Sequence, residues 1–339
     1  MPLGLGWSIT IFFSTALLTW AWIRVARKYR IHDQPERRRL HFSDVPRAGG
    51  ISIGLVMLSA SLFLVFRSPG SNHFLPLPAF GLFLYLALGF WDDIKPMSSG
   101  KKLFLHLLAA GILCCVAIFQ LHTGFAVAII TAFAYLLFVN IWNFMDGSNG
   151  LVTMQSLACT IGFLALGYFS DTTYYYALAL AVCCLGFLPF NFPVARVFLG
   201  DVGSHVLGAA LVGLALLAYA EGQWTWLEML CLASALWVDA VMTFVRRGIR
   251  GYKLAQAHRS HLYQYAIRNG QSHAMVCLCY TSWTAGMILI IGFSRQLSDA
   301  TQAVLMFTLI AAACLLHQWL RLFVLKSARY QKKPKLILQ

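Results

Sequence analysis

The sequence predicts an all-α fold, a polytopic integral membrane bundle of about eleven transmembrane helices in a single domain, residues 1–339. Of its 339 residues, 59% are hydrophobic and only 11% are charged, and the mean hydropathy is +0.70. Soluble proteins are about half apolar and about a quarter charged. This composition excludes a soluble two-domain protein and indicates a polytopic membrane protein.

Apolar stretches of roughly the 17 to 25 residues that cross a bilayer occur along the whole chain. They cover 5–23, 51–66, 76–91, 103–121, 124–142, 151–169, 173–190, 204–220, 225–245, 274–293 and 301–323. The first stretch is not a cleavable signal peptide, because its positive charges follow the apolar residues instead of preceding them. All nine cysteines lie within these stretches. We interpret them as small buried apolar side chains, neither disulfides nor zinc ligands.

The basic residues lie almost entirely in alternate connections. The chain has 26 Lys and Arg against 12 Asp and Glu, a net charge of +14. All the basic residues except Arg67 and Arg295 fall in 24–50, 92–102, 191–203, 246–273 and the segment from Arg321 onwards. The positive-inside rule makes this side cytoplasmic. An odd number of spans then predicts a periplasmic N-terminus, a cytoplasmic C-terminus and a basic cytoplasmic tail, 324–339. The pattern favours a lipid bilayer as the partner and excludes nucleic acid.

Seven of the twelve acidic residues lie in the same cytoplasmic connections, which indicates a polar site at one end of the bundle. They are Asp33, Glu36, Asp44, Asp92, Asp93, Asp146 and Asp201. Adjacent carboxylates such as Asp92 and Asp93 repel, so a divalent metal or phosphate-binding lysines nearby would explain the pair. The alternative is two solvated acids at a helix end.

The third and fourth connections carry further amide and carboxylate groups. Asn140, Asn143, Asp146 and Asn149 fall within ten residues, and such a set suits a nucleobase edge or a hard cation. A turn rich in side-chain caps is the alternative. Asp201, between two glycines near a helix start, suits Mg²⁺ on a phosphorylated ligand or an ordinary N-cap.

The fifth connection, 246–273, is basic and contains His258, Arg259, His261 and Tyr263. It suits recognition of a diphosphate or a sugar, with simple positive-inside topology as the alternative. Asp239 is the sole acid deep in a predicted span. It either pairs with the loop arginines or faces the bundle interior.

In this order on one face, the motifs resemble the polyprenyl-phosphate N-acetylhexosaminyl-1-phosphate transferase superfamily, which includes the enzymes that initiate lipid I and O-antigen synthesis. The resemblance covers nearly the whole chain. The motifs are Asp33-x-Pro35, Pro46-Arg47-x-Gly49-Gly50, Asp92-Asp93 with Lys102, Asn140-x-x-Asn143-x-x-Asp146-Gly147, Asn191-x-Pro193, Phe198-x-Gly200-Asp201-x-Gly203-Ser204 and His258-Arg259-Ser260-His261-x-Tyr263-Gln264.

The resemblance implies a role for each motif. Asp201 and Asn143 match Mg²⁺ ligands, with Mn²⁺ as an alternative ion. Asp92, Asp93 and Lys102 match the catalytic positions, where Asp92 is either a base or a nucleophile. The implied substrate-binding residues are Asn140, Asp146, Asn149, Asn191, His258, Arg259, His261 and Arg47.

The implied reaction is attack by undecaprenyl phosphate on the β-phosphorus of a UDP-N-acetylated sugar, which yields a polyprenyl-diphospho-sugar and UMP. This chemistry implies a multi-pass protein of the bacterial inner (plasma) membrane, with a homodimer left open. Metal and lysine would neutralise the charge that develops at phosphorus. The alternative from another class is a transporter or flippase for an anionic lipid, which would tend to place polar residues near the bilayer midplane.

This sequence departs from the superfamily's pattern at three places. Asn149 stands where many bacterial relatives have Asp, and His106 follows Lys102 where Gln is commoner. The fifth connection lacks the His-rich strings of the lipid I and enterobacterial GlcNAc-1-phosphate enzymes. Its form is nearer to that of O-antigen and capsule initiators, which predicts a donor other than UDP-muramoyl-pentapeptide.

Overall fold

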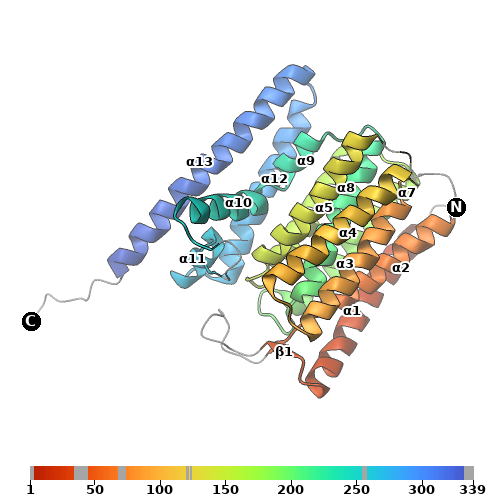
Figure 1. Ribbon diagram of the computed structural model, residues 1–339, viewed down its shortest axis with the longest axis horizontal. Helices are drawn as coiled ribbons and strands as arrows, with labels where there is room; N and C mark the ends of the chain where they lie inside the picture. Colours follow the sequence, from red (N-terminus) through yellow and green to blue (C-terminus); the bar gives the residue numbers. More distant parts are fainter. Residues whose placement is uncertain are drawn as a thin grey trace, which may run out of the picture.

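The computed structural model describes residues 4–33, 45–67, 74–119, 122, 124–253 and 258–331, and in these ranges the chain is a helical bundle (Figure 1). Its elements in order are α1 Gly4–Lys28, β1 His32–Asp33, β2 Val45–Pro46, α2 Ile51–Arg67, α3 Pro76–Ile94, α4 Ser99–Phe119, α5 Phe125–Met145, α6 Leu151–Leu166, α7 Asp171–Asn191, α8 Gly200–Ala220, α9 Trp226–Leu232, α10 Ser234–Ile249, α11 Leu262–Arg268, α12 His273–Ser294 and α13 Asp299–Gln331. The two short strands pair antiparallel, with His32 opposite Pro46.

Each of the eleven predicted apolar stretches is helical, but not every helix is long enough to be a clear membrane span. Among the described residues, eight helices are long and apolar enough to cross a membrane, and α9 with α10 would make a ninth. The α2 and α6 helices have 17 and 16 residues, which is about 25 Å of helix against a hydrocarbon core of about 30 Å. The count of eleven crossings is therefore not confirmed, and the orientation stays a prediction.

The predicted single span 225–245 is two helices. The α9 helix ends at Leu232, α10 begins at Ser234, and their axes differ by 83°. A break frees backbone carbonyls that need a donor, and Trp237 Nε1 donates to the Leu230 carbonyl at 2.7 Å. The predicted apolar stretch is therefore helical but sharply bent, and the indole of α10 satisfies a carbonyl at the end of α9.

The predicted basic tail 324–339 begins inside a helix. The α13 helix continues to Gln331, and residues 332–339 lie outside the described residues, as do Glu36 and Asp44 of the first connection. Figure 1 shows α13 as a long helix along one side of the molecule.

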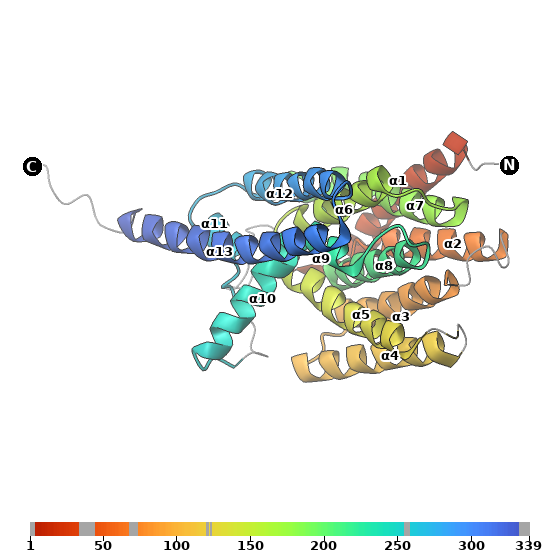
Figure 2. The same ribbon diagram turned by 90° about the horizontal axis from the view of Figure 1, so that it is seen from above.

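The α8 helix is the centre of the bundle (Figure 2). It packs against α2, α3, α5, α6, α7 and α9, and every residue from Val202 to Ala218 is buried. Its N-terminal turn approaches other backbones very closely, because a Cβ on Gly50 would overlap the Cα of Gly203. A Cβ on Gly89 would lie 2.6 Å from the Cα of Val202. Small residues therefore bring the start of α8 against the start of α2 and the end of α3.

Arg295, one of the two basic residues outside the one-sided pattern, has a structural explanation. Its Nε donates to Glu228 at 2.8 Å, and its Nη2 donates to the Gln223 carbonyl at 2.8 Å. Glu228 is 3% exposed and also closes a capping box with Thr225 at the start of α9. Arg295 therefore compensates a buried carboxylate where α9 begins.

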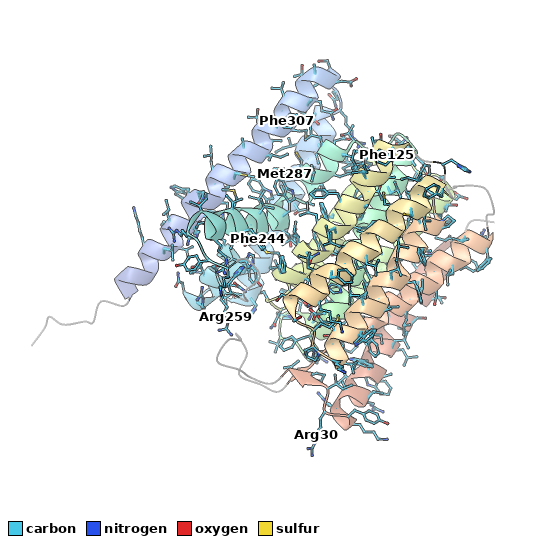
Figure 3. All side chains as sticks on the ribbon, viewed as in Figure 1. Arg30, Phe125, Phe244, Arg259, Met287 and Phe307 are labelled. Carbon is cyan, nitrogen blue, oxygen red and sulfur yellow. The ribbon has the colours of Figure 1, made fainter. Side chains whose placement is uncertain are left out.

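The two ends of the bundle differ in the residues that they present. In Figure 3, Arg30 and Arg259 lie at one end of the molecule, and Phe125 and Phe307 lie toward the other. The connections that carry the predicted site residues, from α3 to α4, α5 to α6 and α7 to α8, lie at the end that carries Arg30. The chain thus collects its polar connections at one end, as the sequence predicts.

Replacing Gly50 with alanine should destabilise the bundle, because the new methyl group would overlap the backbone of Gly203. Overpacking of this kind costs about 1–3 kcal/mol of unfolding free energy. The melting temperature in detergent should fall for Gly50→Ala and stay the same or rise for Gly111→Ala, a control in α4 with nothing within 4 Å of its Cβ position. Equal melting temperatures for the two variants would contradict this packing.

A topology reporter fused after Gln339 should give a cytoplasmic signal, because the segment from Arg321 onwards is basic like the other connections that the positive-inside rule places in the cytoplasm. A second reporter at Ser298, in the turn between α12 and α13, should give a periplasmic signal. A periplasmic signal at Gln339 would overturn the predicted orientation.

Candidate active site

Asp93 holds the start of α8 in place. Its side chain is fully buried and accepts hydrogen bonds from the backbone N–H of Asp201 at 3.2 Å and of Val202 at 2.9 Å. Arg47 donates to the same carboxylate from Nη2 at 2.6 Å and from Nε at 3.0 Å. A carboxylate is favourable at a helix N-terminus, where free N–H groups and the helix dipole attract negative charge. The α3 end, the α8 start and the segment after β2 therefore meet at one carboxylate.

Gly200 makes this contact sterically feasible. Its φ is +77°, and a Cβ there would lie 2.6 Å from Asp93 Oδ2. Only glycine adopts this backbone region without strain and without blocking the carboxylate. The Gly200-Asp201 pair of the sequence motif thus has a geometric cause.

Lys102 lies between the two other carboxylates of the site. Its Nζ forms an ion pair with Asp92 Oδ2 and lies 3.2 Å from Asp201 Oδ2. The backbone N–H of Met97 donates to Asp92 Oδ1 at 2.7 Å, so both oxygens of Asp92 have partners. The Asp201 side chain is 24% exposed, against 3% for Asp92. Asp201 is therefore the carboxylate that a soluble substrate reaches most easily.

Asn143 and Asp146 bring the end of α5 to the same place. The Asn143 amide donates to Asp201 Oδ1 and to Ser204 Oγ, the latter at 3.2 Å. Burial raises the pKa of Asp146 well above its usual range, and the nearby charges of Asp201 and Asp93 act in the same direction.

The oxygen-rich donor set fits Mg²⁺. No group of three or more His, Cys, Asp or Glu side chains in the described part of the chain is arranged as a metal cluster. Mg²⁺ does not need one, since it is usually held by one or two carboxylates together with substrate phosphates and water. Asp201 with Asn143 suits an ion of this kind that arrives with a diphosphate.

Asn191 and Asn149 order the neighbouring connections. Asn191 is 4% exposed. Its Oδ1 accepts from the Gly150 N–H at 3.0 Å, and its Nδ2 donates to the Val197 carbonyl at 3.0 Å. Asn149 Nδ2 donates to the Pro193 carbonyl at 3.2 Å. These partners favour a positioning role for Asn191 over direct contact with a substrate.

The sequence predicted no role for three histidines that lie near the site, His106, His205 and His273. Asn140, one turn deeper in α5 than Asn143, places Oδ1 3.3 Å from His106 Nδ1, and the His106 ring lies edge-on to His205 at 4.6 Å. Their positions four residues after Lys102 and Asp201 are the only sequence signal for this pair.

His273 accepts from the Asn149 N–H at 3.2 Å, but it is the first residue of an apolar helix and gave no sequence signal.

In the fifth connection, Arg259 lies at the same end of the molecule as Arg30 (Figure 3), and His258 and His261 are within two residues of it in the sequence. Burial, together with the nearby charges of His261 and Arg247, lowers the pKa of His258 to about 4, so this ring is neutral at pH 7. The His261 ring lies between His258 and Tyr263, with centroid distances of 5.0 Å and 5.9 Å. Tyr263 joins this connection to the end of α5, because its hydroxyl group donates to the Phe144 carbonyl at 3.2 Å.

Asp239 faces the bundle interior, the second of the two alternatives that the sequence left open. It is 1% exposed, and its partners include His317 Nε2 at 3.1 Å and Tyr280 Oη at 2.7 Å. It therefore ties together α10, α12 and α13.

Comparison with known proteins agrees with the motifs. Residues 75–219 match glycosyl transferase family 4. A probable undecaprenyl-phosphate N-acetylglucosaminyl 1-phosphate transferase of Bacillus subtilis (strain 168) is 28% identical over 322 residues, 86% of this chain and 84% of the relative. An undecaprenyl-phosphate alpha-N-acetylglucosaminyl 1-phosphate transferase of Thermotoga maritima is 31% identical over 247 residues, 71% of this chain and 72% of the relative.

A second kind of relative is also similar. A phospho-N-acetylmuramoyl-pentapeptide-transferase of Heliobacterium modesticaldum is 27% identical over 313 residues, 83% of this chain and 94% of the relative. The similarity to both kinds extends well beyond the matched segment 75–219. The chain belongs to glycosyl transferase family 4, within the polyprenyl-phosphate N-acetylhexosaminyl-1-phosphate transferase superfamily.

Proposed function

We propose that this membrane protein transfers an N-acetylated sugar-1-phosphate from a UDP-sugar to undecaprenyl phosphate, with release of UMP. The observation that carries the proposal is the arrangement of Asp92, Lys102 and Asp201, in which one ammonium group lies between two carboxylates at the end of an apolar bundle. The relatives named as undecaprenyl-phosphate sugar-1-phosphate transferases support it.

In the proposed reaction a phosphate oxygen of the lipid attacks the β-phosphorus of the UDP-sugar. A new phosphorus–oxygen bond forms there, the bond to the bridging oxygen breaks, and that oxygen leaves with UMP. Catalysis of such a transfer is mainly positioning and charge stabilisation. Lys102 supplies positive charge at the reacting phosphoryl oxygens, and Asp93 keeps the start of α8 and Arg47 in place.

Asp92 acts in this proposal as the group that orients Lys102 and takes a proton from the lipid phosphate. Both of its oxygens already have partners, and its side chain is 3% exposed. The ion pair with Lys102 supports the orienting role directly, and the choice of a base over a nucleophile is part of the proposal.

Asp201 and Asn143 would hold Mg²⁺, which neutralises charge on the diphosphate when it is bound. Asp146 and Asn149 would contact the uridine, with Asn191 positioning the Gly150 backbone next to Asn149. His258, Arg259 and His261 would recognise the sugar and its diphosphate. Because these groups are on separate connections, the UDP-sugar would contact several connections at the polar end of the bundle.

An apolar pocket inside the bundle, which extends from α9 to Trp142, takes part of the prenyl chain in this proposal. It has a volume of about 150 Å³ and lies between α5, α6, α8 and α9. Its lining includes Phe133, Phe138, Trp142, Leu211, Trp226 and Met229. Trp142 directly precedes Asn143 in α5, so a chain in this pocket would place its phosphate near the polar end.

The sugar and the pathway belong to the same proposal. We favour an envelope polysaccharide such as O-antigen in a bacterial inner membrane, because the fifth connection has the form His258-Arg259-Ser260-His261 and lacks the His-rich string of the lipid I enzymes. A lipid transporter remains the alternative from another class. The residues proposed to bind substrate lie in or next to connections at one end of the bundle, which argues against a substrate site at the bilayer midplane.

Membranes that contain this protein should convert one UDP-N-acetylated sugar and undecaprenyl phosphate into a labelled lipid, with release of UMP and a requirement for Mg²⁺. Radiolabelled UDP-GlcNAc, UDP-GalNAc, their 6-deoxy analogues and UDP-muramoyl-pentapeptide would be compared side by side. Transfer from the pentapeptide donor alone would contradict the proposed donor class. Absence of UMP with every donor would favour the transporter.

Asp201→Asn should lower kcat by about 100-fold or more, since it removes a charge beside the reacting phosphates. It should also raise the Mg²⁺ concentration needed for half-maximal rate. The matched control is Asp299→Asn, an exposed carboxylate in the first turn of α13, which should keep the rate within twofold. Normal metal-dependent transfer by Asp201→Asn would refute the assignment of this residue.

A further inference from the structure

The buried carboxylate of Asp239 accepts hydrogen bonds from five donors on four different helices. Its carboxylate, 1% exposed, accepts from Leu262 N at 2.8 Å, Tyr263 N at 3.3 Å, Tyr280 Oη at 2.7 Å, Thr243 Oγ1 at 3.3 Å and His317 Nε2 at 3.1 Å. These donors come from α10, α11, α12 and α13. A buried carboxylate with this many donors fixes the groups around it, because losing any of them would leave a buried charge short of a partner.

The two backbone donors, Leu262 and Tyr263, are the first residues of α11. A carboxylate from another helix therefore caps the start of α11, where free N–H groups attract negative charge. His261, 3% exposed, immediately precedes this cap and places Nδ1 3.8 Å from the same carboxylate. Asp239 thus sets the position of the backbone that carries the proposed sugar-recognition residues.

Tyr263 connects the start of α11 to the segment that contains Asn143 and Asp146. It is 1% exposed, and its Oη donates to the Phe144 carbonyl at 3.2 Å. A Cβ on Gly147 would overlap that oxygen, so the phenol lies directly against the connection between α5 and α6. Phe144 follows Asn143 and Gly147 follows Asp146 in the sequence. The phenol therefore touches the backbone next to two residues of the candidate active site.

We infer that Asp239 and Tyr263 are positioning residues that couple the 258–261 segment to the Asn143–Gly147 segment. The inference rests on the proposed function and deepens it, because it assigns donor recognition to two segments held in one fixed relation. Asp239 acts through the start of α11, and Tyr263 acts through its hydroxyl group. Losing either link should weaken binding of the UDP-sugar, which needs both segments, more than binding of the prenyl phosphate.

The kinetic test uses Asp239→Asn, Tyr263→Phe and the double variant in the full-length protein. Each single variant should raise the KM for the UDP-sugar by about 10-fold, a typical loss when a positioning contact is removed, with kcat and the KM for prenyl phosphate within twofold. The double variant should be no worse than the worse single variant. Ser234→Ala is the control, because it removes the 2.8 Å bond from Trp283 between α12 and α10 without touching α11; its KM should not change.

A second measurement does not depend on catalysis. Hydrogen–deuterium exchange of backbone amides should become faster in both 144–150 and 258–264 for Asp239→Asn and Tyr263→Phe, and in neither segment for Ser234→Ala. The coupling would be overturned if exchange became faster only in 258–264, or if the KM effects of the two single variants added in the double variant. It would also be overturned if the variants showed only a fall in kcat in proportion to their loss of folded protein. If the wild-type protein transfers no sugar from any donor, the proposed function fails, and exchange in 144–150 still decides whether the two segments are coupled.

Discussion

The arrangement of the site depends on one interaction, the buried Asp93 carboxylate at the N-terminus of α8. It accepts from two backbone N–H groups of that helix and from the Arg47 guanidinium. Because α8 lies at the centre of the bundle and is buried along nearly its whole length, fixing its first turn also fixes Asp201 relative to the end of α3. The negative charge is tolerated in this buried place because helix N–H groups and a cation surround it. Lys102 can therefore contact both Asp92 and Asp201.

A similar arrangement occurs at another buried carboxylate, Asp239. It caps α11 as Asp93 caps α8, and each also accepts hydrogen bonds from side chains of other elements. In both cases an acid on one helix determines where another helix begins. The residues proposed to act on substrate, Asp201 and His261, lie at or next to these capped starts. Rigid helix ends therefore carry the proposed chemistry, and the apolar parts of the helices supply the scaffold.

Much of the candidate site could be predicted because acids are rare in this chain. With 12 acidic residues in 339, the gathering of Asp92, Asp93 and Asp201 in connections on one side was informative, and the structure brings all three together. The roles within the group were harder to predict. Adjacent carboxylates look equivalent in sequence, yet Asp93 points at a helix start and Asp92 at a lysine. Likewise Asn191 looks like a ligand, but its amide is taken up by backbone groups.

The sequence by itself determined the class of fold, the positions of the eleven apolar helical stretches and the end of the bundle where polar groups gather, since apolar length and charge distribution are properties of the chain alone. Tertiary structure decided the rest. The burial of Asp239 depends on donors up to 78 residues away. Such contacts join residues far apart in the chain, so no local pattern of residue types could specify them.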